Sequence, residues 1–210
     1  FYRFIYIIKT SKMNEFLKVV RDRRSANKFV EGIKIPREDF NEIFKELTLA
    51  PSAFNLQHAH YYIAEDEKVV NEIYEASYNQ YKIKTASATI VITGDKNAYL
   101  GADKIYEGSK MLGIIDSSEY DFMINMIHDL YERWGEEFRH DEAIRNASLS
   151  AMQFMLLAKN KEWDTCPMIY FEKDKIKKIL NIPENEVPVL MITMGKNDTS
   201  SSRVRGYRKA

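Results

Sequence analysis

The first third of the chain carries two helical stripes of hydrophobic residues. Residues 14–23 place three apolar side chains on one helical face: Phe16, Leu17 and Val20. A second stripe repeats at positions i, i+3, i+4 and i+7: Phe40, Ile43, Phe44 and Leu47. Pro36 suits the first position of this helix. The helix should end at Ala50-Pro51, because a residue before proline is driven out of helical geometry.

The rest of the chain contains strand-like and helix-like segments. Three segments of β-branched and apolar residues are typical of strands: 59–65, 87–93 and 187–194. The second is expected to end in a turn at Gly94-Asp95, and the third at Gly195. Helices are predicted over four further segments: 67–78, 97–140, 141–161 and 172–181. Because strands and helices mix without strict βαβ alternation, the sequence predicts an α+β fold.

Length and composition indicate one domain with a substantial core. The chain has 210 residues, of which 45% are hydrophobic. Its 31 Lys and Arg residues balance its 31 Asp and Glu residues, so we expect neither a nucleic-acid nor a membrane partner. No run approaches the roughly 18 apolar residues that a membrane span needs. The single cysteine, Cys166, excludes an internal disulfide and fits a reducing cytoplasm.

The chain divides into a short start and one folded unit. Residues 1–12 are apolar and aromatic but lack a small-residue cleavage site, so we do not interpret them as a signal peptide. We expect an upstream extension or an expression remnant, or else an edge strand that packs on the body. A helical pattern begins after Met13, and residues 13–210 are expected to form one domain that ends in a C-terminal arm.

Two basic clusters are candidate anion sites. Arg23, Arg24 and Ser25 follow the first helix, and two guanidinium groups with a hydroxyl suit a phosphate. A solvated charged loop is the alternative. The second cluster lies in the tail: Arg203, Arg205, Arg208 and Lys209. It fits a nucleic-acid patch, a phosphate clamp made by a folded-back tail, or a solvated tail. The net charge of zero, and the lack of a base-stacking platform interleaved with the basic residues, argue against a nucleic-acid site.

Other polar residues offer weaker signals. The loop at residues 51–57 (PSAFNLQ) can bond a planar heterocycle, ribityl hydroxyls or its own backbone, and a turn-forming role is the alternative. His58 and His60 share one face of a predicted strand. No third or fourth metal ligand accompanies them, so no metal site is expected. Cys166 has no obvious histidine partner and is not expected to be a nucleophile.

Four motifs together resemble the FMN-dependent nitroreductase family. They are Arg23-Arg24-Ser25, Ala50-Pro51-Ser52 with Asn55 and Gln57, Asp164-Thr165-Cys166-Pro167-Met168, and Arg203-Val204-Arg205. They keep the family's order, and the resemblance covers roughly residues 13–208. It implies a central mixed, mostly antiparallel sheet flanked by helices, in an intertwined homodimer with FMN at the subunit interface. A G-x-G-x-x-G turn is absent, so NAD(P)H would not be held by a Rossmann motif.

The resemblance also implies which residues contact FMN. The phosphate would be bound by Arg23, Ser25, Arg203 and Arg205, with Arg24 and Asn27 beside them. The other subunit would line the flavin with Pro51, Ser52, Ala53, Asn55 and Gln57. Asn79 and Lys82 would contact the pyrimidine edge, and Pro167, Met168, Ile169 and Tyr170 would bring a main-chain N–H near flavin N5. A lysine at the pyrimidine edge stabilises the charge of the reduced flavin. The apolar helix 141–161 would form the buried spine of the dimer interface.

Three places depart from the family's pattern. Asn27 stands where Arg or Lys is frequent, so one cation near the flavin is missing. Gln57-His58-Ala59 replaces the usual Gln-Pro-Trp. Ile169 and Tyr170 replace glycines and add bulk beside N5, so Tyr170 is expected to narrow the substrate cleft.

The resulting expectation is an FMN-dependent oxidoreductase. It would take hydride from NAD(P)H and reduce a small acceptor, such as a nitroaromatic or a quinone, in a ping-pong reaction. The cofactor would do the chemistry, and no side-chain acid or base is required. Three alternatives stay open: a flavin-binding storage or sensor protein without turnover, a flavin dehalogenase or dehydrogenase on the same scaffold, and a basic-tailed interaction protein without cofactor.

Overall fold

The computed structural model describes residues 15–201 and 204–209, so the predicted extension at 1–12 lies outside the described residues. The helices are α1 (Glu15–Asp22), α2 (Arg37–Leu47), α3 (Glu67–Ala76), α4 (Tyr81–Thr85), α5 (Ala102–Met111), α6 (Ser117–Asn160) and α7 (Lys173–Ile179). The strands are β1 (Ala59–Ala64), β2 (Ala88–Asp95), β3 (Asp164–Met168) and β4 (Glu186–Gly195). Short 3-10 turns are η1 (Ala53–Asn55), η2 (Ala98–Gly101) and η3 (Thr199–Ser201).

The four strands form one sheet in the order β1-β2-β4-β3. Its three strand pairs are antiparallel. A bridge between Ser25 and Thr165 adds a parallel contact at the β3 edge. β2 is buried along almost its whole length, which explains its continuous apolar sequence. The predicted α+β class and the mostly antiparallel sheet are confirmed.

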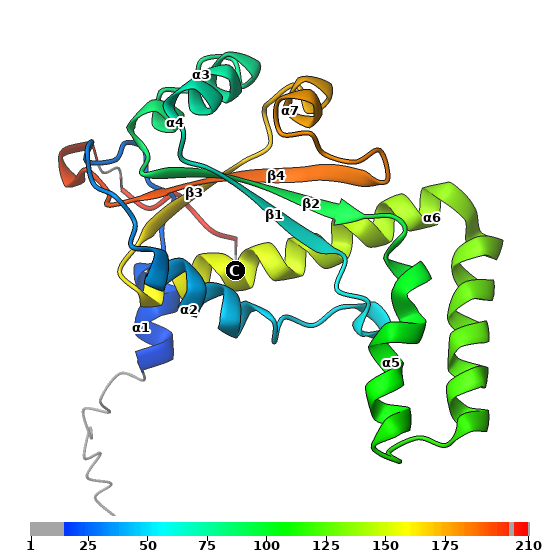
Figure 1. The fold of residues 1–210 in the computed structure, drawn as a ribbon. Helices are drawn as coiled ribbons and strands as arrows, with labels where there is room; N and C mark the ends of the chain where they lie inside the picture. Colours follow the sequence, from blue (N-terminus) through cyan, green and yellow to red (C-terminus); the bar gives the residue numbers. More distant parts are fainter. Residues whose placement is uncertain (1–14, 202–203, 210) are drawn as a thin grey trace, which may run out of the picture.

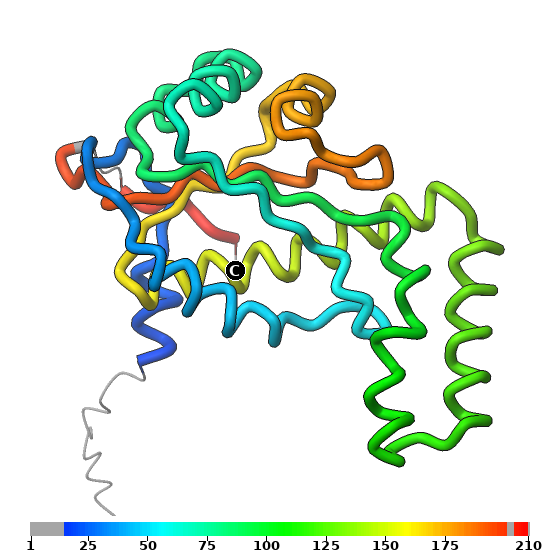
Figure 2. The backbone as a smooth tube through the Cα atoms, in the orientation of Figure 1, coloured from blue at the N-terminus to red at the C-terminus, as the bar shows by residue number. Residues whose placement is uncertain are grey.

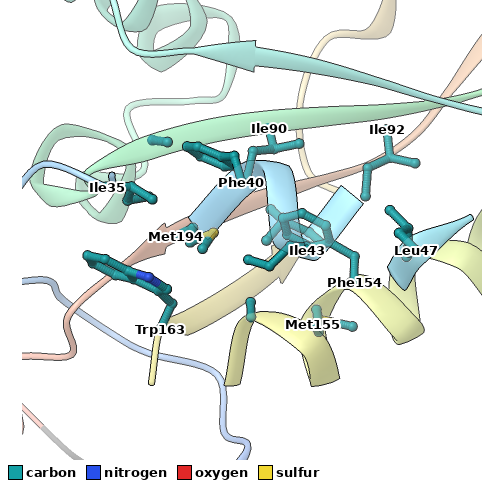
Figure 3. Close-up of a cluster of buried hydrophobic side chains, with 14 of the residues drawn as sticks. Ile35, Phe40, Ile43, Leu47, Ile90, Ile92, Phe154, Met155, Trp163 and Met194 are labelled. Carbon is teal, nitrogen blue, oxygen red and sulfur yellow. The ribbon is translucent and has the colours of Figure 1, made fainter. Parts of the chain in front are cut away.

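Helices cover both faces of the sheet (Figure 1). One face packs against α2 and the second half of α6, where Phe40, Ile43 and Phe154 lie on Ile90 and Ile92 of β2 (Figure 3). Ile90 and Ile92 are two residues apart, so they point to the same face. The predicted stripe of α2 is therefore the stripe that packs on the sheet.

The opposite face of the sheet packs against α3, α4 and α7. Ile73, Ile83 and Ile176 come from these three helices and lie in one cluster with Val91 and Met191 of the central strands. Val91 stands between the two isoleucines of the other face, as strand alternation requires. The molecule thus has three layers, with the sheet in the middle.

The helix α6 consists of two parts that meet at Gly135. This glycine has φ 75° inside the element, a conformation that a residue with a Cβ seldom adopts. The first part pairs with α5 in a hairpin that projects from the body (Figure 1), and the second part runs along the sheet. Leu149 and Met152 on the second part are 48% and 42% exposed. The helix 141–161, predicted to form the buried spine of a dimer interface, thus keeps part of its apolar surface exposed within a single chain.

Several details differ from the sequence-based prediction. The segment 97–140 is not one helix, because it contains η2, α5, a turn and the start of α6. β3 was not predicted, because it contains Pro167; the strand lies at the sheet edge, where a missing N–H donor is tolerated. α4 has five residues, too few to show a helical period. Gly94 continues β2 and does not begin a turn. A Cβ on Gly94 would lie 2.3 Å from the carbonyl oxygen of Ala143, so glycine lets α6 approach the strand.

In the described ranges no helix has the length and apolar character to span a membrane.

Candidate functional site

A basic cleft of about 400 Å³ lies between the end of α1, β3 and the C-terminal tail. Five residues predicted to contact the cofactor line it: Arg23, Arg24, Ser25, Asn27 and Arg205. Residues that were not predicted as cofactor contacts also line it, including Lys159, Asp164, Asn197, Thr199 and Arg208. We call it the arginine cleft. The remaining predicted phosphate ligand, Arg203, lies outside the described residues.

The C-terminal tail folds back to the end of α1 (Figure 2). The guanidinium of Arg205 donates hydrogen bonds to the main-chain carbonyls of Arg21 and, at 3.4 Å, Arg23. α1 ends at Asp22, and a cationic side chain suits the free carbonyls at a helix C-terminus. Arg205 thus holds the tail against the end of α1, while residues 204–209 are all exposed.

The arginine cleft concentrates positive charge. Burial lowers the pKa of the Arg23 guanidinium below its usual value. The neighbouring positive charges of Arg205 and Arg208 lower this pKa further, each by less than burial does. A bound anion would relieve this repulsion and form charge-assisted hydrogen bonds. The carboxylates of Asp22 and Asp164 also line the cleft, and Asp164 pairs with the Lys159 ammonium at 2.9 Å. The chemistry of this donor set therefore fits a phosphate group.

Contacts along β3 connect the arginine cleft to α4. The main-chain N–H of Ala26 donates to the carbonyl of Thr165 at 3.0 Å. At the next residue, the Cys166 Sγ accepts a hydrogen bond from Lys82 Nζ at 3.3 Å. The segment with the predicted phosphate residues and the predicted pyrimidine-edge lysine thus both contact β3.

The loops before α4 and after β3 are joined. Gln80 Nε2 donates to the main-chain carbonyl of Tyr170 at 2.7 Å. Asn79 lies beside it at φ 55°, a left-handed conformation that asparagine adopts more readily than most residues. The structure therefore brings the predicted pyrimidine-edge residues, Asn79 and Lys82, close to the predicted N5 segment, 167–170.

The loop at residues 51–57 does not line the arginine cleft of its own chain. Pro51, Ser52 and Gln57 line a separate cavity of about 180 Å³. The hydroxyl of Ser52 accepts the main-chain N–H of Gln57 at 3.0 Å, and Gln57 Nε2 donates to the Asn55 carbonyl at 3.3 Å. These bonds support the turn-forming role for the loop.

Asn146 anchors this loop and was missed by the sequence analysis. Its Oδ1 accepts the main-chain N–H of Ala53 at 2.7 Å, and its Nδ2 donates to the Glu142 carboxylate at 3.2 Å. Asn146 and Glu142 are both buried on α6. The available signal was a pair of polar residues spaced i and i+4 in a helix expected to be buried.

His58 and His60 make separate contacts. His58 is 1% exposed, and its Nε2 lies 3.4 Å from the Tyr131 hydroxyl. Burial lowers the pKa of His58 to about 4, so its imidazole is neutral at pH 7. His60 Nδ1 lies 2.7 Å from the Glu186 carboxylate. Across the described part of the chain, no three His, Cys, Asp or Glu side chains gather where they could hold a metal ion.

The fold and the site define an α+β protein with an arginine-lined anion cleft at its edge strand. The Nitroreductase family model matches residues 20–196, and the chain belongs to the nitroreductase family. A Bacillus subtilis protein named "Putative NAD(P)H nitroreductase MhqN" is 52% identical over 197 residues, which are 94% of this chain and 96% of that protein.

Solved structures give the same result. The crystal structure of Bacillus subtilis YdfN has a TM-score of 0.91 at 51% identity, with 93% of this chain and 95% of that chain covered. An Exiguobacterium sibiricum structure in complex with FMN has a TM-score of 0.83 at 27% identity, with 93% and 94% covered. The family resemblance that the four sequence motifs indicated is confirmed.

Proposed function

We propose that the chain is an FMN-dependent oxidoreductase that takes hydride from NAD(P)H and reduces a small acceptor such as a nitroaromatic or a quinone. One observation carries the proposal: the arginine cleft adjoins β3, and Lys82 contacts the same strand. A phosphate site and a cationic site for a ring edge therefore lie along one element. The fold is shared with the FMN complex from Exiguobacterium sibiricum, and the name of MhqN specifies NAD(P)H and nitroreductase activity.

The phosphate of FMN is proposed to bind in the arginine cleft. Arg23, Arg24 and Arg205 supply guanidinium groups there, and Ser25 and Asn27 supply a hydroxyl and an amide. Arg203 is proposed to join them. Arginine binds phosphate in a bidentate manner without a glycine-rich loop. The donors present in the cleft thus replace the phosphate-binding turn that the sequence lacks.

The flavin ring is proposed to lie between α4 and the end of β3. When bound, FMN supplies the hydride and electron transfer. Asn79 and Lys82 are assigned to the pyrimidine edge, where the Lys82 charge offsets negative charge on the reduced cofactor. The segment facing N5 is assigned to Pro167, Met168, Ile169 and Tyr170.

NAD(P)H and the acceptor are proposed to use the same cleft in turn, which is a ping-pong order. With a quinone, NAD(P)H, a proton and the quinone give NAD(P)+ and the hydroquinone. With a nitro compound, NAD(P)H, a proton and the nitro group give NAD(P)+, a nitroso group and water. Water supplies the protons, and no side-chain acid or base is assigned.

The proposed working unit is a homodimer in which loop 51–57 of one chain reaches the flavin of the other. The loop lines a cavity separate from the arginine cleft of its own chain. α1 buries none of its residues, and its apolar stripe is exposed: Phe16, Leu17 and Val20. Leu149 and Met152 are also exposed on α6. A second copy of the chain would cover these apolar surfaces.

The remaining assignments concern the whole chain. We propose that residues 13–210 form one domain with a C-terminal arm. The neutral net charge favours small-molecule substrates over nucleic acid or membrane partners. The proposed location is the cytoplasm, where the free thiol of Cys166 stays reduced.

The test is anaerobic reduction of the FMN-saturated protein by NADH and, separately, NADPH. We expect the visible absorbance of oxidised flavin to disappear and to return when a nitroaromatic or a quinone is added. If neither nucleotide bleaches the bound flavin, the enzymatic proposal is wrong, and a storage or sensor protein is favoured. A folded protein that does not take up FMN would overturn the cofactor assignment as well.

A further inference from the structure

Two exposed tyrosines from separate loops stack on each other. Tyr78 follows α3 and Tyr170 follows β3. Their ring centroids lie 4.1 Å apart, with an interplanar angle of 20°. The residues are nevertheless 49% and 64% exposed. Since each ring covers one face of the other, exposure of this size means that the outer faces and edges are open.

The two loops are held together by further contacts. Gln80 Nε2 donates to the Tyr170 carbonyl at 2.7 Å, and the main-chain N–H of Glu172 donates to the Ala76 carbonyl at 2.9 Å. Tyr78 has φ 53°, a strained conformation for a bulky residue, which persists only where the surroundings enforce it. The stacked pair is therefore a preorganised surface. We call Tyr78 and Tyr170 the tyrosine shelf.

The tyrosine shelf overlaps the residues assigned to the flavin ring: Tyr170 ends the N5 segment, and Tyr78 directly precedes Asn79. Gln80, which bonds the Tyr170 carbonyl, directly precedes α4. Lys82 on α4 contacts Cys166 of β3, and Tyr170 lies two residues beyond the end of that strand. The intervening Ile169 is 80% exposed and extends the apolar surface. An aromatic platform thus stands at the end of the strand that carries the proposed ring contacts.

Resting on the proposed function, we propose that the tyrosine shelf selects the electron acceptor and favours flat aromatic molecules, such as quinones and fused-ring nitroaromatics. Planar rings gain most from offset stacking on an open aromatic face. The phenolic hydroxyls can also donate to the carbonyl oxygen of a quinone or to a nitro group. An octahedral anion such as ferricyanide has no flat ring, so the shelf gives it no stacking advantage.

The test compares Tyr78→Leu and Tyr170→Leu with Tyr81→Leu in the FMN-loaded protein. Tyr81 is an exposed tyrosine of the same region that lies outside the stacked pair. The first readout is the Kd of the bicyclic quinone menadione for the oxidised protein, measured by calorimetry without an electron donor. The second is the rate at which menadione or ferricyanide reoxidises protein reduced with dithionite under anaerobic conditions.

Both shelf variants are expected to raise the menadione Kd about three- to ten-fold, the range that loss of an aromatic pair produces. Reoxidation by menadione should slow in both variants at low quinone concentration, while reoxidation of Tyr78→Leu by ferricyanide is unchanged. Tyr170→Phe keeps the ring and should bind menadione within about two-fold of the wild type, because stacking is retained. Tyr81→Leu should match the wild type.

Wild-type menadione affinity in both shelf variants would overturn the proposal. So would an equal loss with ferricyanide in Tyr78→Leu, since this result indicates a general structural defect. Neither readout uses NAD(P)H. A protein that binds menadione through the shelf but is not reduced by NAD(P)H would contradict the proposed function and leave this inference standing.

Discussion

The side-chain oxygen of Asn146 accepts a 2.7 Å hydrogen bond from the main-chain N–H of Ala53, although the two residues are 93 positions apart. The bond fixes the start of η1 against α6. Glu142 completes the anchor by accepting a bond from Asn146 Nδ2 at 3.2 Å. The position of loop 51–57 therefore depends on one amide side chain of the long helix.

Replacing this amide should weaken cofactor binding. We predict that Asn146→Ala raises the Kd for FMN about three- to ten-fold, because one partly buried hydrogen bond contributes about 1 kcal/mol. The Kd is measured by titrating the protein into FMN and following flavin fluorescence. Ser148→Ala is the matched control, since Ser148 Oγ bonds to the Ile144 carbonyl within α6. Unchanged FMN affinity in Asn146→Ala would separate the loop from the flavin site.

The arginine cleft should recognise the phosphate and not the ring. We predict that Arg23→Gln weakens FMN binding by about ten-fold or more, because a hydrogen bond to a charged group contributes about 1.5–3 kcal/mol. Riboflavin lacks the phosphate, so its affinity should not change. Arg37→Gln, on the exposed start of α2, is the control. Parallel loss of FMN and riboflavin binding would contradict the assignment of the cleft to phosphate.

Lys82 should set the reduction potential of the bound flavin. We predict that Lys82→Met lowers the two-electron potential by about 30 mV, which corresponds to about 1.4 kcal/mol of lost stabilisation of the reduced form. Lys84→Met is the control on the same helix, because Lys84 Nζ lies over the Tyr74 ring at 4.6 Å. The potentials are measured by equilibration with a reference dye. Equal potentials in the wild type and Lys82→Met would remove Lys82 from the ring edge.

The sequence predicted the elements whose burial imposes a regular spacing. Phe40 and Ile43 repeat with a helical period because one face of α2 packs on the sheet. β2 appears as a continuous apolar run because both of its faces are covered. β3 shows neither signal, since Pro167 interrupts it and the sheet edge relaxes the pattern.

Contacts between distant positions were beyond sequence reasoning. Lys82 and Cys166 are 84 positions apart, and no local spacing connects them. The family resemblance placed Arg23 and Arg205 in one site, and the structure places both in the arginine cleft. The family resemblance contains no information on Asn146, whose role depends on the three-dimensional path of loop 51–57.

The proposed dimer should depend on the exposed apolar side of α6. We predict that Leu149→Lys raises the dimer Kd about 100-fold or more, because each interface loses a buried leucine and gains a buried charge. Sedimentation at micromolar concentration measures the change. Glu72→Lys is the control, since Glu72 is exposed on α3, on the opposite face of the sheet. A Leu149→Lys protein that stays dimeric would place the interface elsewhere.

A buried carboxylate should make stability depend on pH through His60. The hydrogen bond to Glu186 raises the pKa of His60 above its ordinary value of 6.5, despite burial, which lowers it. Burial alone would raise the pKa of Glu186, but bonds from His60, Thr93 and Tyr62 outweigh it and lower the pKa. Asp95 lies close enough to favour the charged imidazole as well.

The directions of these two pKa shifts define the pH range over which the pair stabilises the fold. The His60 contribution is complete below pH 6.5 and is lost as the pH rises through its raised folded-state pKa. The Glu186 contribution is present above its ordinary pKa of 4.5 and is lost as the pH falls through its lowered folded-state pKa. Both groups are therefore charged and paired between these limits. Because His60 is 47% exposed, solvent screening keeps the effect at about 1 kcal/mol or less.

We predict that the wild type loses stability relative to His60→Gln when the pH rises from about 6 to about 9, the interval that spans the histidine titration. Glutamine can still donate a hydrogen bond to Glu186 but does not titrate. Urea unfolding at fixed protein and FMN concentrations measures the difference, because both concentrations shift apparent stability. His140→Gln is the control, since His140 is an exposed surface histidine next to Asp141. A constant stability difference between the wild type and His60→Gln across this interval would show that folding does not raise the pKa of His60.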